Sequence, residues 1–360
     1  MSRALPAESS ARARRLLPPL AWTALLLTFV VVVASAFIRH TQAGLDCADW
    51  PACYATALAE PDAQTPSTGV RVARALHRLG ASIALLAIFG TVLLARIAGD
   101  GSPKGLRSAD SVVQHRGGPS DSRTRRLAVA ALVLALGLAV LGVATRGATL
   151  PAVPLGNLVG GYLLLAVLAA LAGSVAGPAS ESQRATPARV QWLACALLGL
   201  VLVQAAVGGL IGTQSALRAC ATLDRCEGAV GDALAAGAAL DPFRRPAVVA
   251  GQVVPPPGAG GLHTLHRALG IAVTLAAWIL AFALRTSQRR AAVLLAVLAL
   301  AAVLLGATAI LRMPSLAATV LHNAAAAACV ATLGFVLARR AAQESGAHAF
   351  CNSSTAFGAK

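Results

Sequence analysis

The amino-acid sequence predicts an all-α integral membrane protein with eight transmembrane helices, arranged as two pseudo-symmetric four-helix bundles. Composition, the lengths of the uncharged runs and an internal repeat support this prediction. Of the 360 residues, 57% are hydrophobic and only 12% are charged, and the mean hydropathy is +0.71. A soluble domain carries roughly twice that share of charged residues, so the composition excludes a water-soluble protein of this size.

Eight runs contain no Asp, Glu, Lys or Arg, and each is at least 17 residues long. A helix that crosses a bilayer needs about 17–25 apolar residues, so each run predicts one span. The runs are Leu16–Ile38, Leu79–Ala95, Leu127–Thr145, Gly147–Ser180, Val190–Leu217, Ala268–Leu284, Ala291–Leu311 and Met313–Ala338. A ninth uncharged stretch, Pro246–His266, contains Val-Pro-Pro-Pro-Gly-Ala-Gly-Gly, which no lipid-exposed helix accommodates.

The distribution of Lys and Arg predicts the orientation of these spans, because basic residues concentrate in cytoplasmic loops. One face of the membrane receives 19 of the 30 basic residues and 6 of the 14 acidic ones. Its segments are 1–15, 96–126, 181–189, 285–290 and 339–360. We therefore expect both termini on the cytoplasmic side. The net charge of +16 then reflects orientation and contact with anionic membrane lipid, not nucleic acid.

An internal repeat divides the chain into two halves. The segments after the first and fifth spans each contain two cysteines separated by five residues, and a His-Arg pair followed by a Leu-Gly step opens the next span. These residues are Cys47 and Cys53, His77 and Arg78 in the first copy, and Cys220 and Cys226, His266 and Arg267 in the second. We expect tails at 1–15 and 339–360, a first four-helix half at 16–180 and a second at 181–338.

The four cysteines of the repeat fall on the outer, oxidising face of the membrane, where thiols pair readily. The simplest pairing closes a small ring within each loop, joining Cys47 to Cys53 and Cys220 to Cys226. A zinc site made of all four thiolates is the alternative. The two pairs belong to different halves and lack the ligand spacing that is usual for zinc, which favours disulfides.

Two histidines near the outer ends of the sixth and eighth spans, His266 and His322, are candidate metal ligands. Histidines within a bilayer are costly and usually functional, and two imidazoles on facing helices can hold a haem iron from both sides. Arg78 and Arg267 are each suited to pairing a haem propionate. Capping of a helix, or a hydrogen bond to a neighbour, is the alternative role for each histidine.

Three further positions complete the candidate set. Counting from the His-Arg pairs, with the longer loop at 97–126 allowed for, His322 corresponds to Asn157 in the first half. His263 precedes His266 by one helical turn and shares its helix face. We expect it to be either a group that supports or gates the site, or a solvated histidine at the end of a loop. His40 falls in a loop and receives no role.

This combination resembles the heme A synthase family over roughly residues 20–338. The resemblance rests on Gly44–Cys53, His77–Arg78, Gln204–Gly209, His263–Arg267 and Leu321–Asn323. It implies a membrane oxidoreductase that serves cytochrome oxidase assembly by oxidising the C8 methyl of haem O to the formyl group of haem A. It also implies a location in the bacterial cytoplasmic (inner) membrane. The expected partners are a farnesyltransferase that supplies haem O, an electron donor and further copies of the chain in a homo-oligomer.

In such proteins the carboxy-terminal half holds a haem b cofactor between two histidines, here His266 and His322. The amino-terminal half receives haem O as substrate at two more histidines, with a glutamate one turn before the first. This half of the chain departs from the pattern at both places, because Arg74 replaces the glutamate before His77 and Asn157 replaces the second histidine.

Three functions remain open on the sequence alone. The first is a heme A synthase-like oxygenase in which His77, Arg74 and Asn157 form a modified substrate site. The second is a non-catalytic haem b-binding membrane protein that aids oxidase assembly or carries electrons. The third is a transporter built on repeats, although transporters usually have broken helices and polar residues at the membrane midplane, which these spans largely lack.

Overall fold

A computed structural model describes most of the chain. The described residues are 7–43, 45, 67–100, 121–144, 150–176, 187–220, 236–245, 247–249, 252–311 and 315–354. Within them, eight helices are long and apolar enough to cross a membrane. They are α1 (Ala7–Gln42), α3 (Thr68–Asp100), α4 (Asp121–Ala144), α5 (Ala152–Val175), α6 (Ala188–Thr213), α8 (Ala259–Leu284), α9 (Arg289–Leu311) and α10 (Leu316–Ser354). The prediction of an all-α, multi-pass membrane protein is therefore confirmed.

Several helices extend beyond the uncharged runs that predicted them. The first span was expected at 16–38, but α1 begins at Ala7 and ends at Gln42. The second was expected at 79–95, but α3 begins at Thr68, and α10 continues to Ser354 through most of the expected tail. Arginines interrupted the runs but not the helices, because a long basic side chain can lie along apolar surface and keep its charge in water.

The proline-rich stretch does not form a span of its own, as expected, although its last residues, Ala259–His266, form the start of α8 (Ala259–Leu284). It contains an antiparallel pair of short strands, β1 (Ala247–Val249) and β2 (Gln252–Val254). Gly258 then adopts φ 79°, a backbone conformation that favours glycine, and α8 begins at the next residue. A five-residue helix, α7 (Ala236–Leu240), and a 3₁₀ turn, η1 (Ala216–Ala219), lie nearby. We call this end of the molecule, marked by β1 and β2, the hairpin end.

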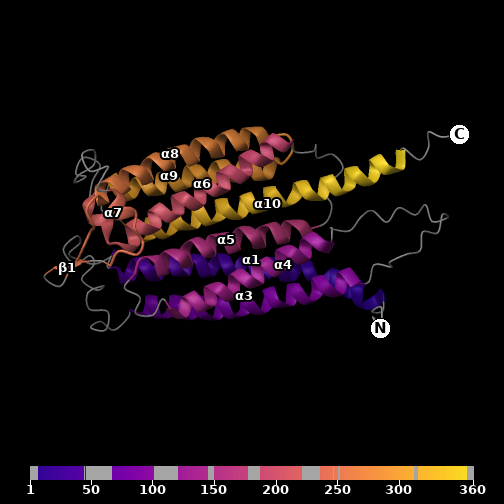
Figure 1. Ribbon diagram of the computed structural model, residues 1–360, viewed down its shortest axis with the longest axis horizontal. Helices are drawn as coiled ribbons and strands as arrows, with labels where there is room; N and C mark the ends of the chain where they lie inside the picture. Colours follow the sequence, from indigo (N-terminus) through magenta and orange to yellow (C-terminus); the bar gives the residue numbers. More distant parts are fainter. Residues whose placement is uncertain are drawn as a thin grey trace.

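Helices pack both within and between the two halves of the sequence (Figure 1). In the first half, α1 packs against α3 and α5, and α4 also packs against both. In the second half, α8 packs against α6 and α9, and α10 also packs against both. Helix α10 joins the halves by packing on α5 and α1, while α6 also contacts α5. The start of α1 and the end of α10 lie at the end opposite the hairpin.

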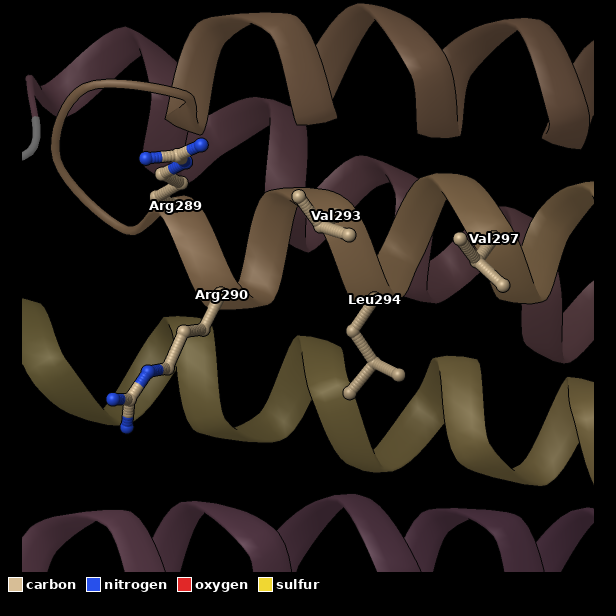
Figure 2. Close-up of a pocket in the computed structure, with 5 residues that line it drawn as sticks. All are labelled: Arg289, Arg290, Val293, Leu294 and Val297. Atoms are coloured by element: carbon tan, nitrogen blue, oxygen red, sulfur yellow. The ribbon is translucent and has the colours of Figure 1, made fainter.

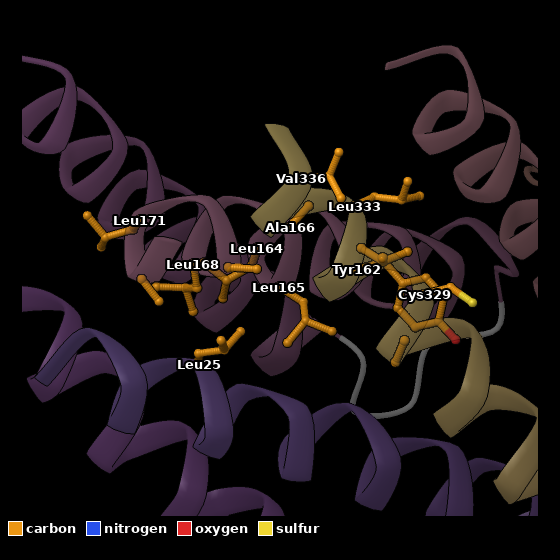
Figure 3. Close-up of a cluster of buried hydrophobic side chains, with 14 of the residues drawn as sticks. Leu25, Tyr162, Leu164, Leu165, Ala166, Leu168, Leu171, Cys329, Leu333 and Val336 are labelled. Atoms are coloured by element: carbon orange, nitrogen blue, oxygen red, sulfur yellow. The ribbon is translucent and has the colours of Figure 1, made fainter. Parts of the chain in front are cut away.

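The core lies where the two halves meet. Tyr162, Leu165 and Leu168 of α5 are almost fully buried, as are Val330 and Leu333 of α10. Figure 3 shows several of these side chains gathered between α5, α10 and α1. Far from the hairpin end, the interface also contains hydrogen bonds from the Arg123 side chain to α10.

That polar contact joins α4 to α10. The Arg123 guanidinium donates hydrogen bonds to the carbonyl oxygens of Leu337 and Ala338, at 3.2 and 2.8 Å. The side chain of Gln191 on α6 donates to the same Leu337 carbonyl at 3.3 Å. The two halves are thus joined by buried apolar side chains and by hydrogen bonds. These contacts fix the position of α10, which carries His322, relative to the first half.

Candidate functional site

The imidazole rings of His266 and His322 lie beside each other in the second half of the chain, in an edge-type arrangement. His266 lies in the third turn of α8, and His322 lies in the second turn of α10. Their ring centroids are 6.4 Å apart and the ring planes are inclined at 62°. Helices α8 and α10 are thereby linked across the bundle that they form with α6 and α9.

The separation of the two rings matches what one metal ion between them requires. An imidazole nitrogen lies about 2 Å from a bound first-row metal ion and about 1 Å from its own ring centre, so two opposed imidazoles have centres about 6 Å apart. The observed value is 6.4 Å. The separation of the two rings is therefore compatible with one metal ion held between them.

A hydrogen bond to α9 sets the orientation of the His322 ring. Its Nδ1 lies 2.7 Å from the carbonyl oxygen of Ala302, and because a carbonyl only accepts, Nδ1 carries the proton. The lone pair is then on Nε2, the nitrogen available to a metal. Metal-binding histidines commonly donate their second ring N–H in this way. Gly306 leaves room for the ring, since a Cβ there would lie 3.3 Å from it.

The ring of His266 is held against α6. A Cβ built on Gly208 would lie 2.7 Å from the ring, so only glycine leaves the space that His266 occupies. The amide nitrogen of Gln204, one turn earlier on α6, donates to the backbone carbonyl of His266 at 2.9 Å and lies 3.4 Å from its Nε2. Each histidine of the pair thus rests on a glycine of a neighbouring helix.

Buried polar atoms without a partner gather around this pair. Among the described residues, eleven buried side-chain nitrogen or oxygen atoms make no hydrogen bond, and seven of them lie toward the hairpin end. Those seven belong to Arg39, Gln204, Gln214, Ser215, His266 and Arg267. Unsatisfied buried polar groups are rare in native proteins. A carboxylate would satisfy the nitrogen donors of Arg39 and Arg267, whereas the amide oxygens of Gln204 and Gln214 need a hydrogen-bond donor.

Comparison with known protein families decides the identity of the chain. The model of the cytochrome oxidase assembly protein family, COX15-CtaA, matches residues 18–333. The chain belongs to this family. This is the heme A synthase family that the sequence motifs resemble. No curated protein matches the sequence significantly.

Membership of the family supports a role in cytochrome oxidase assembly and heme A synthesis, with a haem-related cofactor or substrate. The match covers six of the eight spans in full and the first and last in part, and it includes every candidate ligand from His77 to His322.

The residues expected at the substrate site lie in the first half, at the same end of the molecule as the histidine pair. His77 and Arg74 are half-buried on α3, and Asn157 is half-buried on α5. Asn157 is the sixth residue of its helix and His322 the seventh of α10, so the two helices carry them at nearly equal depth. Within the described residues the His77 ring makes no hydrogen bond, and no ring contact joins α3 to α5.

The two arginines expected to pair with propionates differ in their surroundings. Arg267 is half-buried, and its Nε and Nη2 are buried atoms without a hydrogen-bond partner in the described residues. Arg78 is exposed. The structure therefore places Arg267 where a carboxylate would satisfy buried donors, whereas Arg78 is free to reach the membrane surface.

His263 is a buried residue, so the interpretation of it as a solvated histidine is wrong. Its side chain is only 8% exposed, and its Nε2 lies 2.9 Å from the carbonyl oxygen of Ala216 in η1. Ser215, just before η1, has φ 56°, which is unusual for a residue with a side chain. His263 thus attaches the turn after α6 to the helix that carries His266.

Of the four cysteines of the repeat, only Cys220 belongs to the described residues. Cys220, at the end of η1, is buried and is paired in a disulfide. Cys47, Cys53 and Cys226 lie outside the described residues, so both expected pairings remain predictions. Cys329 is a buried free thiol in the core, and Cys195 is an exposed free thiol.

Sequence reasoning missed a polar group where the two halves meet. His40 was placed in a loop, but it lies in the last turn of α1 and is 9% exposed. A Cβ on Gly212 of α6 would lie 3.7 Å from its ring. Arg39 precedes it, and Tyr162 on α5 donates a 3.0 Å hydrogen bond to the carbonyl of Asn323, the residue after His322. Only the helix packing brings these residues together.

A shallow pocket on the outer surface of α9 is unrelated to this site. It is lined by Arg289, Arg290, Val293, Leu294 and Val297. Figure 2 shows Arg290 and Leu294 extending toward α10, at the end of α9 remote from Ala302. All five side chains are exposed residues of α9.

Proposed function

We propose that the protein is a heme A synthase-type membrane oxygenase, which converts the C8 methyl group of haem O to a formyl group for cytochrome oxidase. In this proposal His266 and His322 hold a haem b cofactor in the second half, and the first half receives haem O as substrate. The observation that carries the proposal is the 6.4 Å separation of the two imidazole rings in a chain of this family.

The residues of the second half prepare a site with two nitrogen ligands. Ala302 holds the proton of His322 on Nδ1, leaving Nε2 free to coordinate. Gly208 and Gln204 fix the position of His266 from α6. Arg267 would pair with a propionate carboxylate through its buried donors. When bound, haem b would supply electrons one at a time to the substrate half.

In the first half, His77 is the candidate ligand for the substrate iron. Its ring makes no hydrogen bond in the described residues, so a ring nitrogen is available for coordination. The amide of Asn157 is a poor iron ligand, which would leave the second face of the substrate iron open to oxygen. Arg74 carries a fixed positive charge and cannot relay protons as a carboxylate does, but it can hold a propionate.

The same two substitutions favour a second candidate function. If Arg74 and Asn157 have abolished oxygenation, the chain would be a non-catalytic haem b protein that aids oxidase assembly or transfers electrons. The half that contains His266 and His322 is unchanged in this alternative. The two functions therefore share the cofactor site and differ only in whether haem O reacts in the first half.

The remaining expectations extend the proposal to location and partners. We propose that the protein resides in the bacterial cytoplasmic membrane with both termini in the cytoplasm, supported by basic residues such as Arg285, Arg289 and Arg290 at the end opposite the hairpin. A farnesyltransferase would supply haem O, and a separate donor would supply electrons. The partner of Cys220 would be Cys226, with Cys47 paired to Cys53.

Co-expression tests this function directly. The chain is expressed with a haem O-producing farnesyltransferase in a host that makes no haem A, and the extracted haems are separated. Haem A in the extract supports the oxygenase. If the purified protein contains haem b while the cells accumulate haem O and no haem A, the non-catalytic function is supported instead. Protein without any haem would contradict both.

A further inference from the structure

The end of α1, which belongs to the first half, lies beside the haem ligand of the second half. The ring of His40 is next to Gly212, one turn beyond Gly208 on α6, and is close enough to His322 to interact with it electrostatically. Helix α1 also packs directly against α10. The histidine pair is thus bordered by a helix from the other half of the repeat.

Arg39 brings a half-buried cation to this border. Its Nε is buried without a hydrogen-bond partner, and its side chain makes no hydrogen bond or ion pair in the part of the chain that the structure describes. Its guanidinium interacts electrostatically with Tyr162, whose hydroxyl donates to the carbonyl of Asn323. Arg39 is therefore a neighbour of the backbone that carries His322.

A guanidinium nitrogen that is buried without an acceptor, as the Nε of Arg39 is, is unfavourable because its desolvation is not compensated. The described acidic side chain at the hairpin end, Asp241, is exposed, and it accepts from the backbone N–H of Phe243. No described carboxylate lies against Arg39. A guanidinium donates two parallel hydrogen bonds to a carboxylate, so a ligand that carries one would satisfy it.

We propose that Arg39 binds a propionate carboxylate of the haem held between His266 and His322, so that the first half of the chain completes the cofactor site of the second. Arg267 pairs with a propionate from α8, while Arg39 does so from α1. The proposal rests on the proposed haem site, but not on catalysis. It assigns to α1 a ligand-binding residue for a cofactor whose metal ligands are both on other helices.

The first test compares Arg39→Met with Arg39→Lys in the purified full-length protein, isolated from cells that make no haem O. Arg71→Met is the matched control, since Arg71 is an exposed arginine near the hairpin end that bonds only to Thr68. The measurements are the rate of haem transfer to apomyoglobin and the midpoint potential of the haem.

We expect Arg39→Met to lose haem about tenfold or more faster, as for removal of one charge-assisted hydrogen bond. Its midpoint potential should fall, because a positive charge near the iron favours the reduced form. Arg39→Lys should give intermediate values and Arg71→Met should match the wild type. Unchanged retention and potential in Arg39→Met would overturn the proposal, as would equal changes in Arg71→Met.

A second test does not depend on how well the variant folds. Haem and its dimethyl ester, which has no carboxylates, are each bound to wild-type and Arg39→Met protein. If Arg39 contacts a propionate, esterification weakens binding less in the variant than in the wild type. Equal weakening in both proteins would contradict the proposal. Wild-type protein that binds no haem would instead defeat the proposed function, which keeps the two failures distinguishable.

Discussion

The hydroxyl of Tyr162 donates a hydrogen bond of 3.0 Å to the backbone carbonyl oxygen of Asn323. Tyr162 belongs to α5 in the first half of the chain, and Asn323 follows His322 in the second. Tyr162 is 1% exposed, so this contact lies within the core. The position of one proposed haem ligand is therefore coupled to the half that would receive the substrate.

Replacing Tyr162 by Phe removes this bond and leaves the ring packing in place. We expect the free energy of unfolding to fall by about 1 kcal/mol, the net value of one buried hydrogen bond. The haem should remain bound, with a changed low-spin electron paramagnetic resonance spectrum because His322 is less restrained. A spectrum identical to that of the wild type would show that the bond does not position His322.

Replacing Gly208 by Ala should displace the ring of His266, since the added Cβ would lie 2.7 Å from it. We expect a loss of about 1–3 kcal/mol from overpacking, together with a lower haem content per protein. Gly199→Ala is the matched control, because a Cβ there on the same helix meets nothing within 4 Å. Equal haem content in the two variants would contradict the assigned position of His266.

Removing the His263 side chain should release the turn after α6. His263→Leu leaves the Ala216 carbonyl without its 2.9 Å partner, which costs about 1–3 kcal/mol for an unsatisfied buried group. Hydrogen exchange at residues 216–220 should become faster. Thr264→Val is the control, because Thr264 bonds only to Gly260 within its own helix. Unchanged exchange in His263→Leu would count against this role.

Restoring the family pattern in the first half tests whether that half is catalytic. We expect Arg74→Glu combined with Asn157→His to increase the yield of haem A, because the pair returns a proton-accepting carboxylate and a second imidazole. The two single variants are the controls for the double variant. Haem A is measured in extracts of co-expressing cells. No gain over the wild type would indicate that the first half has a different function.

The sequence predicted the spans because they depend on local patterns, since long uncharged runs identify helices wherever they lie in the fold. The repeated His-Arg pairs also singled out His266, whose ring lies beside that of His322 in the structure, and the role of these two histidines as haem ligands stays a prediction. The proline-rich segment was also predicted not to span the membrane, and β1 and β2 agree with this. The helix ends were predicted less well, because α1 and α3 continue through arginines that ended the runs.

The contacts between the halves could not be predicted in this way. His40, Arg39 and Tyr162 are separated by more than 100 residues from the α10 positions that they approach, and no periodic pattern links them. Their proximity follows from how α1 and α5 pack on α10. Buried arginine and histidine near the end of an apolar span are nevertheless a signal, since such groups are costly unless they serve a ligand.

The central claim is that His266 and His322 together bind one haem iron. The most direct test is the absorption and electron paramagnetic resonance spectrum of the purified protein, compared with His266→Ala and His322→Ala. We predict a low-spin haem b with two imidazole ligands in the wild type, and loss of that signal in both variants. A colourless wild-type preparation, or an unchanged spectrum in both variants, would contradict the claim.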